Sequence, residues 1–522
     1  MTVNENHSKG INLHTTYISF FIVVLFTMYT IIQPENAASI IDKARTFITF
    51  HANTWYVALG GLFFAFCFII AISPYGKIKL GADNEKPKYS YFAWFAMLYA
   101  AGQGIGIIFW SIAEPMFHFA SGTPFSKAVN NSVAADHAMT VAFFHWGLNA
   151  WGIYCIVGLS LAFVSYRLKK SFSIRYTLYP LFGSKIEGWL GTLIDIIAVF
   201  ATIFGIATSL GLGVQQINAG LNALWNVPQD IATQLLLITV ISACALMSVL
   251  SGIGRGIKYL SIVNMWLTIV LLVFFIVLGP TIYILKILFS ASYNYVLEFI
   301  PMNIFVESSD KLINDPEASW KNLWQGWWTV FYWGWWMSWA PFVGVFVARV
   351  SRGRTIREFV IGVIGVSSIL SFVWLAAYGG TALHIDLFNG GEIANIVKNN
   401  VADALYATID GMKLGTTGIV ASAIGTLLVA TYFITSSDSG TLVITTIMSG
   451  GDKNPQYRHR IFWGVMQGML ASVLLVAGGN AALSTLQTAS IAAALPFSLV
   501  MILMCVSLAK GVHQEYKRMA TG

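Results

Sequence analysis

Long apolar segments recur along the whole chain, and short segments that carry charged residues separate them. A helix that crosses a bilayer needs about 20 mostly apolar residues. A shorter amphipathic segment near 288–302 is predicted to lie at the membrane interface. The pattern predicts an all-α integral membrane protein of about twelve spans, near residues 14–33, 55–74, 90–117, 138–166, 188–218, 231–252, 259–285, 326–348, 357–383, 415–447, 461–478 and 483–508.

Composition supports this class of protein. The chain has 522 residues, of which 57% are hydrophobic and 10% are charged, whereas soluble domains carry about 25% charged residues. The net charge of +7 does not indicate nucleic-acid binding, because the basic residues are confined to short loops. The four cysteines lie inside apolar segments without a CxxC motif, so no disulfide framework is expected.

The basic residues also predict the orientation. If both termini are cytoplasmic, most Lys and Arg residues fall in cytoplasmic segments, as the positive-inside rule requires. We expect a cytoplasmic N-terminal tail at 1–13, one transmembrane domain at 14–508 and a short cytoplasmic C-terminal tail at 509–522. The expected location is a bacterial cytoplasmic (inner) membrane. No cleavable signal peptide is expected, because no small-residue cleavage site follows the first apolar segment.

The third and eighth predicted spans stand apart because both are long and interrupted. Glycines interrupt one, and a tryptophan cluster with Pro341 interrupts the other. The two are five spans apart. Transporters built from inverted repeats place broken helices at matching positions, with the substrate between them. We therefore expect two inverted five-helix repeats, spans 3–7 and 8–12, with broken helices at the centre.

The glycine-rich segment in span three runs from Ala101 to Gly106 and contains three glycines. Glycine weakens a helix, and unwound backbone at membrane depth is tolerated where it lines a cavity. Freed carbonyls there could bind a cation, and freed N–H groups could bind a carboxylate. The alternative is that Gly102 and Gly106 form a GxxxG packing face.

Aromatic residues gather in spans four and eight. Trp146, Trp151 and Tyr154 are predicted to share one side of a helix, and Tyr332, Trp336 and Trp339 have the spacing of a helical stripe. A quaternary ammonium has no N–H to donate, so ring faces bind it by cation–π contact, at up to about 2 kcal/mol each when desolvated. The alternative is that these tryptophans are interfacial or core residues.

Span ten contains the hydroxyl-rich segment Tyr432–Ser439. Its hydroxyls, with carbonyls of an unwound helix, could bind Na⁺; alternatively, the hydroxyls bond back to their own helix. Asp438, Glu114 and Asp195 are ionisable groups at membrane depth and are functional candidates by default. A position at the end of a helix or loop would make all three structural.

Other classes of protein fit less well. The nine histidines show no HExxH motif, and Ser439-Gly440 lacks the context of a nucleophile elbow, so we do not expect an enzyme. A cation channel would need a continuous polar pore, which the aromatic clusters disfavour.

Several motifs together resemble the betaine/choline/carnitine transporter family. The most specific is the run Phe331–Phe342, followed by Arg349–Glu358; the others are Gly102–Gly106 with Glu114-Pro115, His145-Trp146, Thr208–Gly213 and Thr435–Asp438. The resemblance covers nearly the whole chain. It implies a twelve-helix secondary transporter with two inverted repeats, usually a homotrimer, which works by alternating access around a central aromatic box.

The resemblance also implies site residues. For the substrate they are Trp146, Trp151, Tyr154 and Trp336, with Trp339 close by, and the segment Gly102, Gln103, Gly104 and Gly106. One Na⁺ site would use Thr435, Ser436 and Tyr432 with backbone of Ala100 and Gln103, and a second would use Thr202 and Phe342.

The chain departs from the family pattern at a few positions. Ile206 replaces a hydroxyl ligand of the second Na⁺ site. Gly106 stands where choline transporters tend to have Asp, which favours a zwitterion. Lys258 lies near the arginine of Na⁺-independent carnitine exchangers, and we interpret it as a lysine at the cytoplasmic end of a helix. The short C-terminal tail predicts weak osmotic regulation.

These observations predict Na⁺-coupled import of glycine betaine or a close analogue, with Na⁺ as the coupling ion and no other cofactor. Expected partners are the small substrate, the lipid bilayer and further copies of the chain, without nucleic acid. Dimethylsulfoniopropionate, carnitine and choline remain alternative substrates, with Na⁺-independent exchange or proton coupling as alternative mechanisms.

Overall fold

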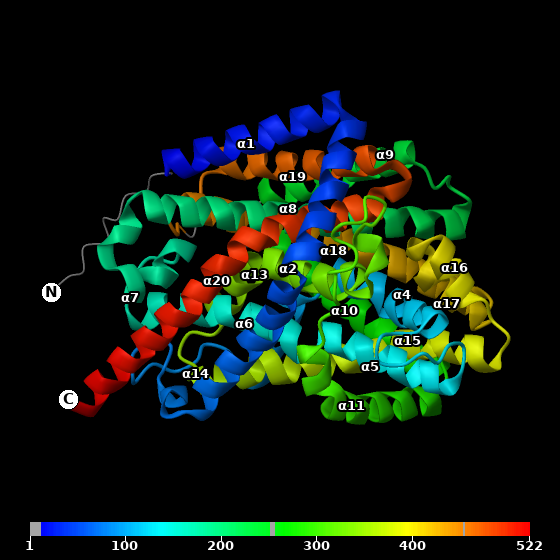
Figure 1. The fold of residues 1–522 in the computed structure, drawn as a ribbon, viewed down its shortest axis with the longest axis horizontal. Coiled ribbons are helices and arrows are strands. Elements are labelled where there is room, and N and C mark those ends of the chain that lie inside the picture. The colour runs from blue at the N-terminus through cyan, green and yellow to red at the C-terminus, as the bar shows by residue number, and fades with distance from the viewer. Residues whose placement is uncertain (1–11, 251–255, 453–454, 522) are drawn as a thin grey trace.

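The computed structural model describes residues 12–250, 256–452 and 455–521, and almost all regular structure in these ranges is helical (Figure 1). Two isolated β-bridges pair Lys79 with Thr355 and Thr123 with Ser126. The α-helices are α1 (Leu13–Ile32), α2 (Pro34–Ile72), α3 (Tyr91–Gly102), α4 (Ile105–Ser121), α5 (Ser132–Trp146), α6 (Leu148–Ala162), α7 (Tyr179–Phe182), α8 (Trp189–Trp225), α9 (Ile231–Leu250), α10 (Gly256–Leu278), α11 (Thr281–Ile304), α12 (Trp324–Trp327), α13 (Thr329–Val350), α14 (Ile356–Val360), α15 (Ser367–Phe388), α16 (Ile393–Asn399), α17 (Ala404–Gly411), α18 (Thr416–Met448), α19 (Tyr457–Gly478) and α20 (Ala482–Thr521).

Ten helical segments among the described residues are long and apolar enough to cross a membrane. They correspond to ten of the twelve predicted spans, and they confirm an all-α membrane protein. The third predicted span falls short because a break divides it into α3 and α4. The eighth, α13, is rich in tryptophan, which hydropathy scales rate as slightly polar. The count of twelve and the inverted repeats therefore stay predictions.

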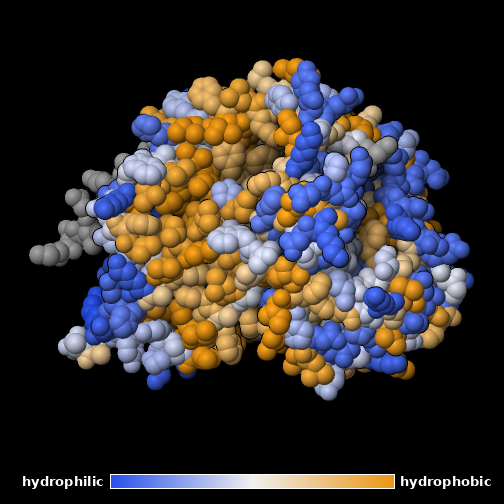
Figure 2. All heavy atoms as spheres, in the orientation of Figure 1, coloured by the Kyte–Doolittle hydropathy of each residue, from blue (hydrophilic) through white to orange (hydrophobic). Residues whose placement is uncertain are grey.

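The surface agrees with this assignment. Figure 2 shows a broad apolar area left of the centre of the molecule, with hydrophilic residues gathered on the right and at the lower left. Helix α1 begins and α20 ends on the left of the same view, whereas α16 and α17 lie on the right (Figure 1). The two ends of the described chain therefore lie on one side, as an even number of crossings requires.

Helix α13 forms the centre of the molecule. It packs against α6, α8 and α20, and α8 in turn packs against α18. Every residue of α13 from Thr329 to Val345 is buried. The tryptophan-rich segment is therefore a core element and does not form an interfacial belt.

The break in the third span lies where the glycines predict it. Helix α3 ends at Gly102 and α4 begins at Ile105, with Gln103 and Gly104 outside both helices. The expected break at Pro341 is wrong, because α13 is continuous through that residue. A proline removes only one hydrogen bond of its helix, and neighbouring helices can compensate for it. The interruption comes earlier, at Trp328, between α12 and α13.

A further break, which the sequence did not lead us to predict, divides the fourth span at Gly147. A β-carbon added to Gly147 would lie 2.5 Å from the carbonyl oxygen of Phe143 and 2.8 Å from the ring of Phe372, so only glycine fits there. The tenth span has no such break, and α18 is continuous from Thr416 to Met448. Without a glycine or proline in the hydroxyl-rich segment, its backbone hydrogen bonds stay intact.

Two boundaries also differ from the prediction. Gly279 and Pro280 end the seventh span at Leu278, and α11 extends the predicted 288–302 segment to Thr281–Ile304. Helix α20 continues through the predicted C-terminal tail to Thr521. Glu515 in that tail is buried and pairs with Arg167 at 2.6 Å, so an ion pair fixes the end of α20 to the body of the protein.

Candidate functional site

A narrow cavity of about 10 Å³ lies at the break between α3 and α4. Seven of the nine predicted substrate-binding residues line it, and Trp151 and Tyr154 do not. The complete lining is Gly102, Gln103, Gly104, Gly106, Ile107, Trp146, Ser209, Trp335, Trp336 and Trp339. The structure therefore brings together segments from α3, α4, α5, α8 and α13.

The aromatic rings form one connected cluster around this cavity. The ring centroids of Trp146 and Trp336 are 4.8 Å apart and nearly perpendicular, and Trp335 stacks on Trp336 at 4.8 Å. Tyr154 lies 6.0 Å from Trp336 and 5.7 Å from Trp151. Trp151 and Tyr154 thus support the rings that line the cavity, in the present conformation.

Hydrogen bonds to the protein fix the indole N–H groups. Trp146 donates to Glu114 Oε2 at 2.8 Å, and Trp336 donates to the backbone carbonyl of His145 at 2.9 Å. Trp339 donates to the carbonyl of Gly205 at 2.7 Å. Because their N–H groups are already used, these three rings offer a ligand chiefly their faces. Ring faces attract a cation that cannot itself donate a hydrogen bond.

The rings favour a positive charge, whereas the start of the broken helix favours a negative one. Gly104 is the N-cap of α4 and provides no side-chain hydrogen bond. The first N–H groups of a helix lack partners within the helix and carry partial positive charge, so they favour an anion. A β-carbon on Gly102 would lie 2.5 Å from the Trp151 ring, and one on Gly106 would lie 2.4 Å from the Trp335 ring. Glycine at both positions lets the backbone approach the aromatic rings.

Gln103 joins the break to α15. Its Nε2 donates to Ser371 Oγ at 3.0 Å, and Trp151 Nε1 donates to the same hydroxyl at 3.4 Å. Its Oε1 is buried and has no hydrogen-bond partner among the described residues. This oxygen at the cavity wall is available to a ligand or an ion.

The residues predicted for the first Na⁺ site come from two places: the broken end of α3 and the helix α18. Ser436 Oγ is 3.8 Å from the position that a β-carbon on Gly104 would take. Thr435 bonds to the carbonyl oxygens of Thr431 and Tyr432 in its own helix, at 3.0 and 3.1 Å. The Tyr432 hydroxyl bonds with Thr268 at 2.9 Å. Ala100 is in α3 just before the break, and its side chain lies outside the described residues.

The residues predicted for the second Na⁺ site offer few free oxygen ligands. Thr202 donates to the carbonyl oxygen of Ala198 in its own helix at 2.7 Å, and Phe342 packs against Trp339. The side chain of Ile206 lies 2.3 Å from where a β-carbon on Gly440 would be. A branched apolar side chain therefore fills the contact between α8 and α18.

Two of the three acids that the sequence marks as candidates form ion pairs with arginine. Asp195 accepts from Arg175 Nε at 2.6 Å. Asp438 accepts from Arg460 at 3.2 Å and from Ser248 at 2.7 Å. These contacts favour a structural role for both acids. The side chain of Lys258 lies outside the described residues.

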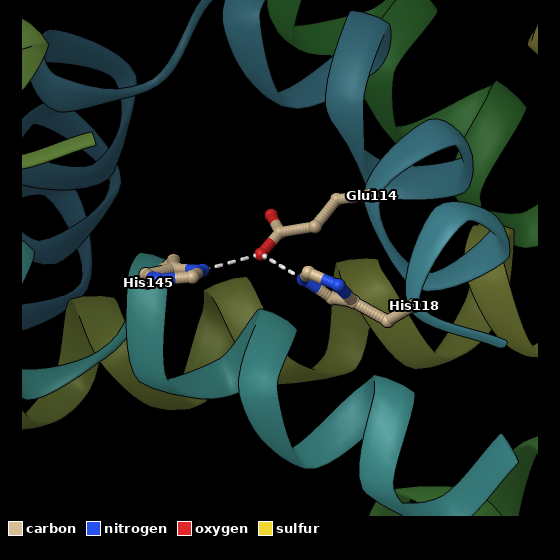
Figure 3. Close-up of side chains that lie close together, drawn as sticks. All are labelled: Glu114, His118 and His145. Carbon is tan, nitrogen blue, oxygen red and sulfur yellow. Dashed lines mark hydrogen bonds and ion pairs between the residues drawn. The ribbon is translucent and has the colours of Figure 1, made fainter. Parts of the chain in front are cut away.

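The third acid, Glu114, lies between two histidines (Figure 3). Its Oε1 is 2.6 Å from His145 Nδ1 and 3.4 Å from His118 Nε2, and all three side chains are buried. The sequence marks Glu114 as a candidate but does not predict that these histidines are its partners. The i, i+4 spacing of Glu114 and His118, and the position of His145 beside Trp146, were the available signals.

The donor atoms of this Glu114–His118–His145 cluster lie within 4.8 Å of one another. Two nitrogen or oxygen ligands of one tetrahedral ion, with bonds of about 2.1 Å, are roughly 3.4 Å apart. The 2.6 Å between Glu114 and His145 is a hydrogen-bond distance instead. As it stands, the cluster is a hydrogen-bonded carboxylate–imidazole arrangement and not a metal centre.

A second cavity, of about 590 Å³, lies among α8, α16, α17 and α18. Tyr406 is its only aromatic lining residue, and Asp403, Asp410 and Lys413 contribute charge. It lacks the several ring faces that a methylated cation requires, so the smaller cavity is the better candidate for the binding site.

Comparison with known proteins identifies the family. A model of the BCCT, betaine/carnitine/choline family transporters matches residues 14–517. The chain is 42% identical to a probable glycine betaine transporter of Desulfitobacterium hafniense, over 96% of this chain and 97% of the other. It is 42% identical to the glycine betaine transporter OpuD of Bacillus subtilis, over 95% and 94% of the two chains.

A third relative is the ectoine/hydroxyectoine transporter of Virgibacillus pantothenticus, with 38% identity over 98% and 99% of the two chains. These relatives are named as transporters and not as enzymes, in agreement with the prediction from the sequence. With a family match over nearly its whole length and a tryptophan-lined cavity at a broken helix, the chain belongs to the betaine/carnitine/choline family of transporters.

Proposed function

We propose that the protein imports glycine betaine, or a close quaternary-ammonium zwitterion, by Na⁺-coupled alternating access. One observation carries the substrate: the same cavity is bounded by the rings of Trp146 and Trp336 and by the uncapped start of α4. The rings suit a methylated cation, and the helix start suits a carboxylate. A zwitterion with one of each satisfies both ends.

The relatives support this substrate and also mark its rivals. Two carry the name of glycine betaine and one the name of ectoine and hydroxyectoine. Dimethylsulfoniopropionate and carnitine present the same pair of charges. Choline has no carboxylate, and with no acidic side chain in the lining of the cavity it gains least from this site.

Na⁺ coupling rests on the hydroxyls beside the break. Na⁺ is a hard cation that prefers oxygen ligands, like Ca²⁺ and Mg²⁺. Ser436 faces Gly104, Gln103 Oε1 is free to coordinate, and Thr435 and Tyr432 lie on the same stretch of α18. We propose one Na⁺ at this position. Ile206 disfavours a second ion near Thr202 and Phe342.

The assembly belongs to the same proposal. We infer twelve spans with inverted repeats, a bacterial inner membrane, cytoplasmic termini and a homotrimer. The two ends of the described chain lie on one side of the molecule (Figure 1), which agrees with this topology.

Substrate binding to the purified protein tests the zwitterion requirement. Three ligands of similar size are compared by tryptophan fluorescence in Na⁺: glycine betaine, choline without the carboxylate, and 3,3-dimethylbutyrate without the positive charge. We expect tight binding of glycine betaine alone, because each analogue leaves one end of the cavity unmatched. Equal binding of 3,3-dimethylbutyrate would show that the rings act only as apolar surface.

The ion site is tested separately. Replacing Ser436 by Ala and Thr435 by Val should raise the Na⁺ concentration needed for half-maximal glycine betaine binding by about tenfold, since removal of a ligand weakens the ion and not the ring contacts. Thr239→Val is a matched control, because Thr239 lies on the exposed face of α9. Unchanged Na⁺ dependence in both variants would place the ion elsewhere.

A further inference from the structure

The Glu114–His118–His145 cluster has no role in the transport scheme above, and yet it touches the aromatic box directly. Glu114 Oε2 accepts the indole N–H of Trp146, while Oε1 contacts both imidazoles. The backbone carbonyl of His145 holds the indole of Trp336. Two of the four tryptophans that line the cavity, Trp146 and Trp336, are therefore anchored to this one cluster.

Among the described residues, the cluster forms no ion pair with any other charged side chain. Glu114 and His118 lie on α4, and His145 is on α5. From α13, Tyr332 stacks on His145 at 4.7 Å and Thr329 bonds to its Nε2 at 3.2 Å. Trp324 of α12 and Trp328 cover the histidines with uncharged rings. No arginine or lysine among the described residues forms an ion pair with Glu114.

A buried carboxylate without a fixed cation needs a proton nearby. An ionised carboxylate only accepts hydrogen bonds, so His145 Nδ1 carries hydrogen in its 2.6 Å contact. If Nε2 is also protonated, it donates to Thr329 and His145 is an imidazolium ion. The cluster is then neutral. Loss of that proton leaves one net negative charge at the N–H edge of Trp146, and the Thr329 hydroxyl can reverse its hydrogen bond to satisfy Nε2.

We propose that Glu114, His118 and His145 form a binding site for a single proton whose occupancy is linked to substrate binding. This inference rests on the proposed function, because it requires the substrate's cation to lie on Trp146 and Trp336. A cation on the face of Trp146 and a proton in the cluster at the N–H edge of the same ring repel each other across a medium of low dielectric. Substrate binding therefore releases part of a proton, and loss of the proton strengthens binding.

The site has a structural reason to respond in this way. Among the described residues, His118 Nε2 has no hydrogen-bond partner and lies 3.4 Å from Glu114 Oε1, so it can share, through that oxygen, the proton that His145 holds. Because Trp146 donates to the second oxygen of Glu114, its anchor is kept in both protonation states. Protonation therefore changes the charge of the cluster and leaves the positions of the Trp146 and Trp336 rings unchanged.

Titration calorimetry tests the linkage on the full-length protein. Glycine betaine is titrated at several pH values between 5.5 and 8.5, in phosphate and in Tris, which differ in ionisation enthalpy. The difference in measured heat gives the number of protons released. We expect a release that peaks at up to one proton within this range, and an affinity that rises by up to about tenfold with increasing pH.

Three variants show which residues are responsible for the proton release. Glu114→Gln keeps an oxygen for Trp146 and should bind glycine betaine without releasing protons. His118→Gln should shift the pH of maximal release. His137→Gln is the matched control, because His137 also lies on α5 but pairs with Glu298 at 3.7 Å, outside the cluster; its release should equal that of the wild type.

The following results would overturn the proposal. Glycine betaine binding with no proton release at any pH contradicts the linkage while leaving the transport function intact, and so does unchanged release in Glu114→Gln. If glycine betaine does not bind at all, the proposed function fails. The proton site is then judged from the pH titration of tryptophan fluorescence without substrate. A transition that Glu114→Gln abolishes supports the site, and one that it leaves unchanged refutes it.

Discussion

At the scale of single residues, the proposed binding site depends on indole rings whose N–H groups are already bonded to the protein. Trp146, Trp336 and Trp339 each donate to a buried oxygen. Their orientation is therefore set before a ligand arrives, so less entropy is lost on binding.

Replacing Trp336 by Ala should weaken glycine betaine binding by about thirtyfold, which corresponds to about 2 kcal/mol for one desolvated cation–π contact. Equilibrium binding of the purified variant measures this. Trp463→Phe on α19 is a suitable control, since Trp463 does not line the cavity. Wild-type affinity in Trp336→Ala would remove this ring from the site.

The aromatic and glycine residues that line the cavity could be predicted, because few residue types suit a methylated cation or an opened helix. Their anchors could not. Hydrogen bonds from Trp336 to the carbonyl of His145 and from Trp339 to that of Gly205 involve backbone atoms that every residue has. Ser209 and Trp335 also line the cavity, but nothing in their local sequence distinguishes them from neighbouring core residues.

At the scale of helices, glycine determines where a span opens. Gly102 and Gly106 allow the broken third span to approach Trp151 and Trp335. Three glycines in one short segment make that break predictable. The single Gly147 that divides the fourth span is not, because its steric requirement comes partly from Phe372, more than 200 residues away in the sequence.

Gly106→Ala should therefore reduce glycine betaine affinity at least tenfold, because the added methyl group would displace the Trp335 ring. Gly365→Ala is the matched control, since no atom lies within 4 Å of the position its β-carbon would take. Binding isotherms of both variants give the comparison. Similar affinities in the two would mean that the ring moves aside without cost.

The buried pair of Asp195 and Arg175 fixes the start of α8 to the preceding 3₁₀ turn, Ile174–Leu178. Asp195→Asn leaves the guanidinium without its charge partner and should destabilise the protein by about 3–5 kcal/mol. Thermal unfolding in detergent measures the change. The double variant Asp195→Asn/Arg175→Met should recover part of the loss; a double variant less stable than the single one would contradict this role.

At the scale of the whole molecule, the hydrophobic pattern predicts where the membrane spans lie better than it predicts where a helix breaks or ends. The hydrophobic pattern located the long helices because burial in lipid demands it at every turn. It could not show that α13 passes Pro341 unbroken or that α20 continues to Thr521, since both depend on contacts between distant helices.

The end of α20 bears on regulation. Glu515 is buried and pairs with Arg167, which also contacts Asp83. A terminal segment held in this way is poorly suited to sense the surroundings of the membrane. Uptake should therefore change less than about twofold between isosmotic and hyperosmotic media, and a steep rise would refute this expectation.

The central claim is that this chain uses its aromatic cavity to move glycine betaine with Na⁺. The most direct test is uptake of labelled glycine betaine into proteoliposomes, with and without an inward Na⁺ gradient, for the wild type and for Trp336→Ala. We predict Na⁺-dependent accumulation by the wild type and little by the variant. Equal uptake without Na⁺ would contradict the coupling, and equal uptake by the variant would contradict the site.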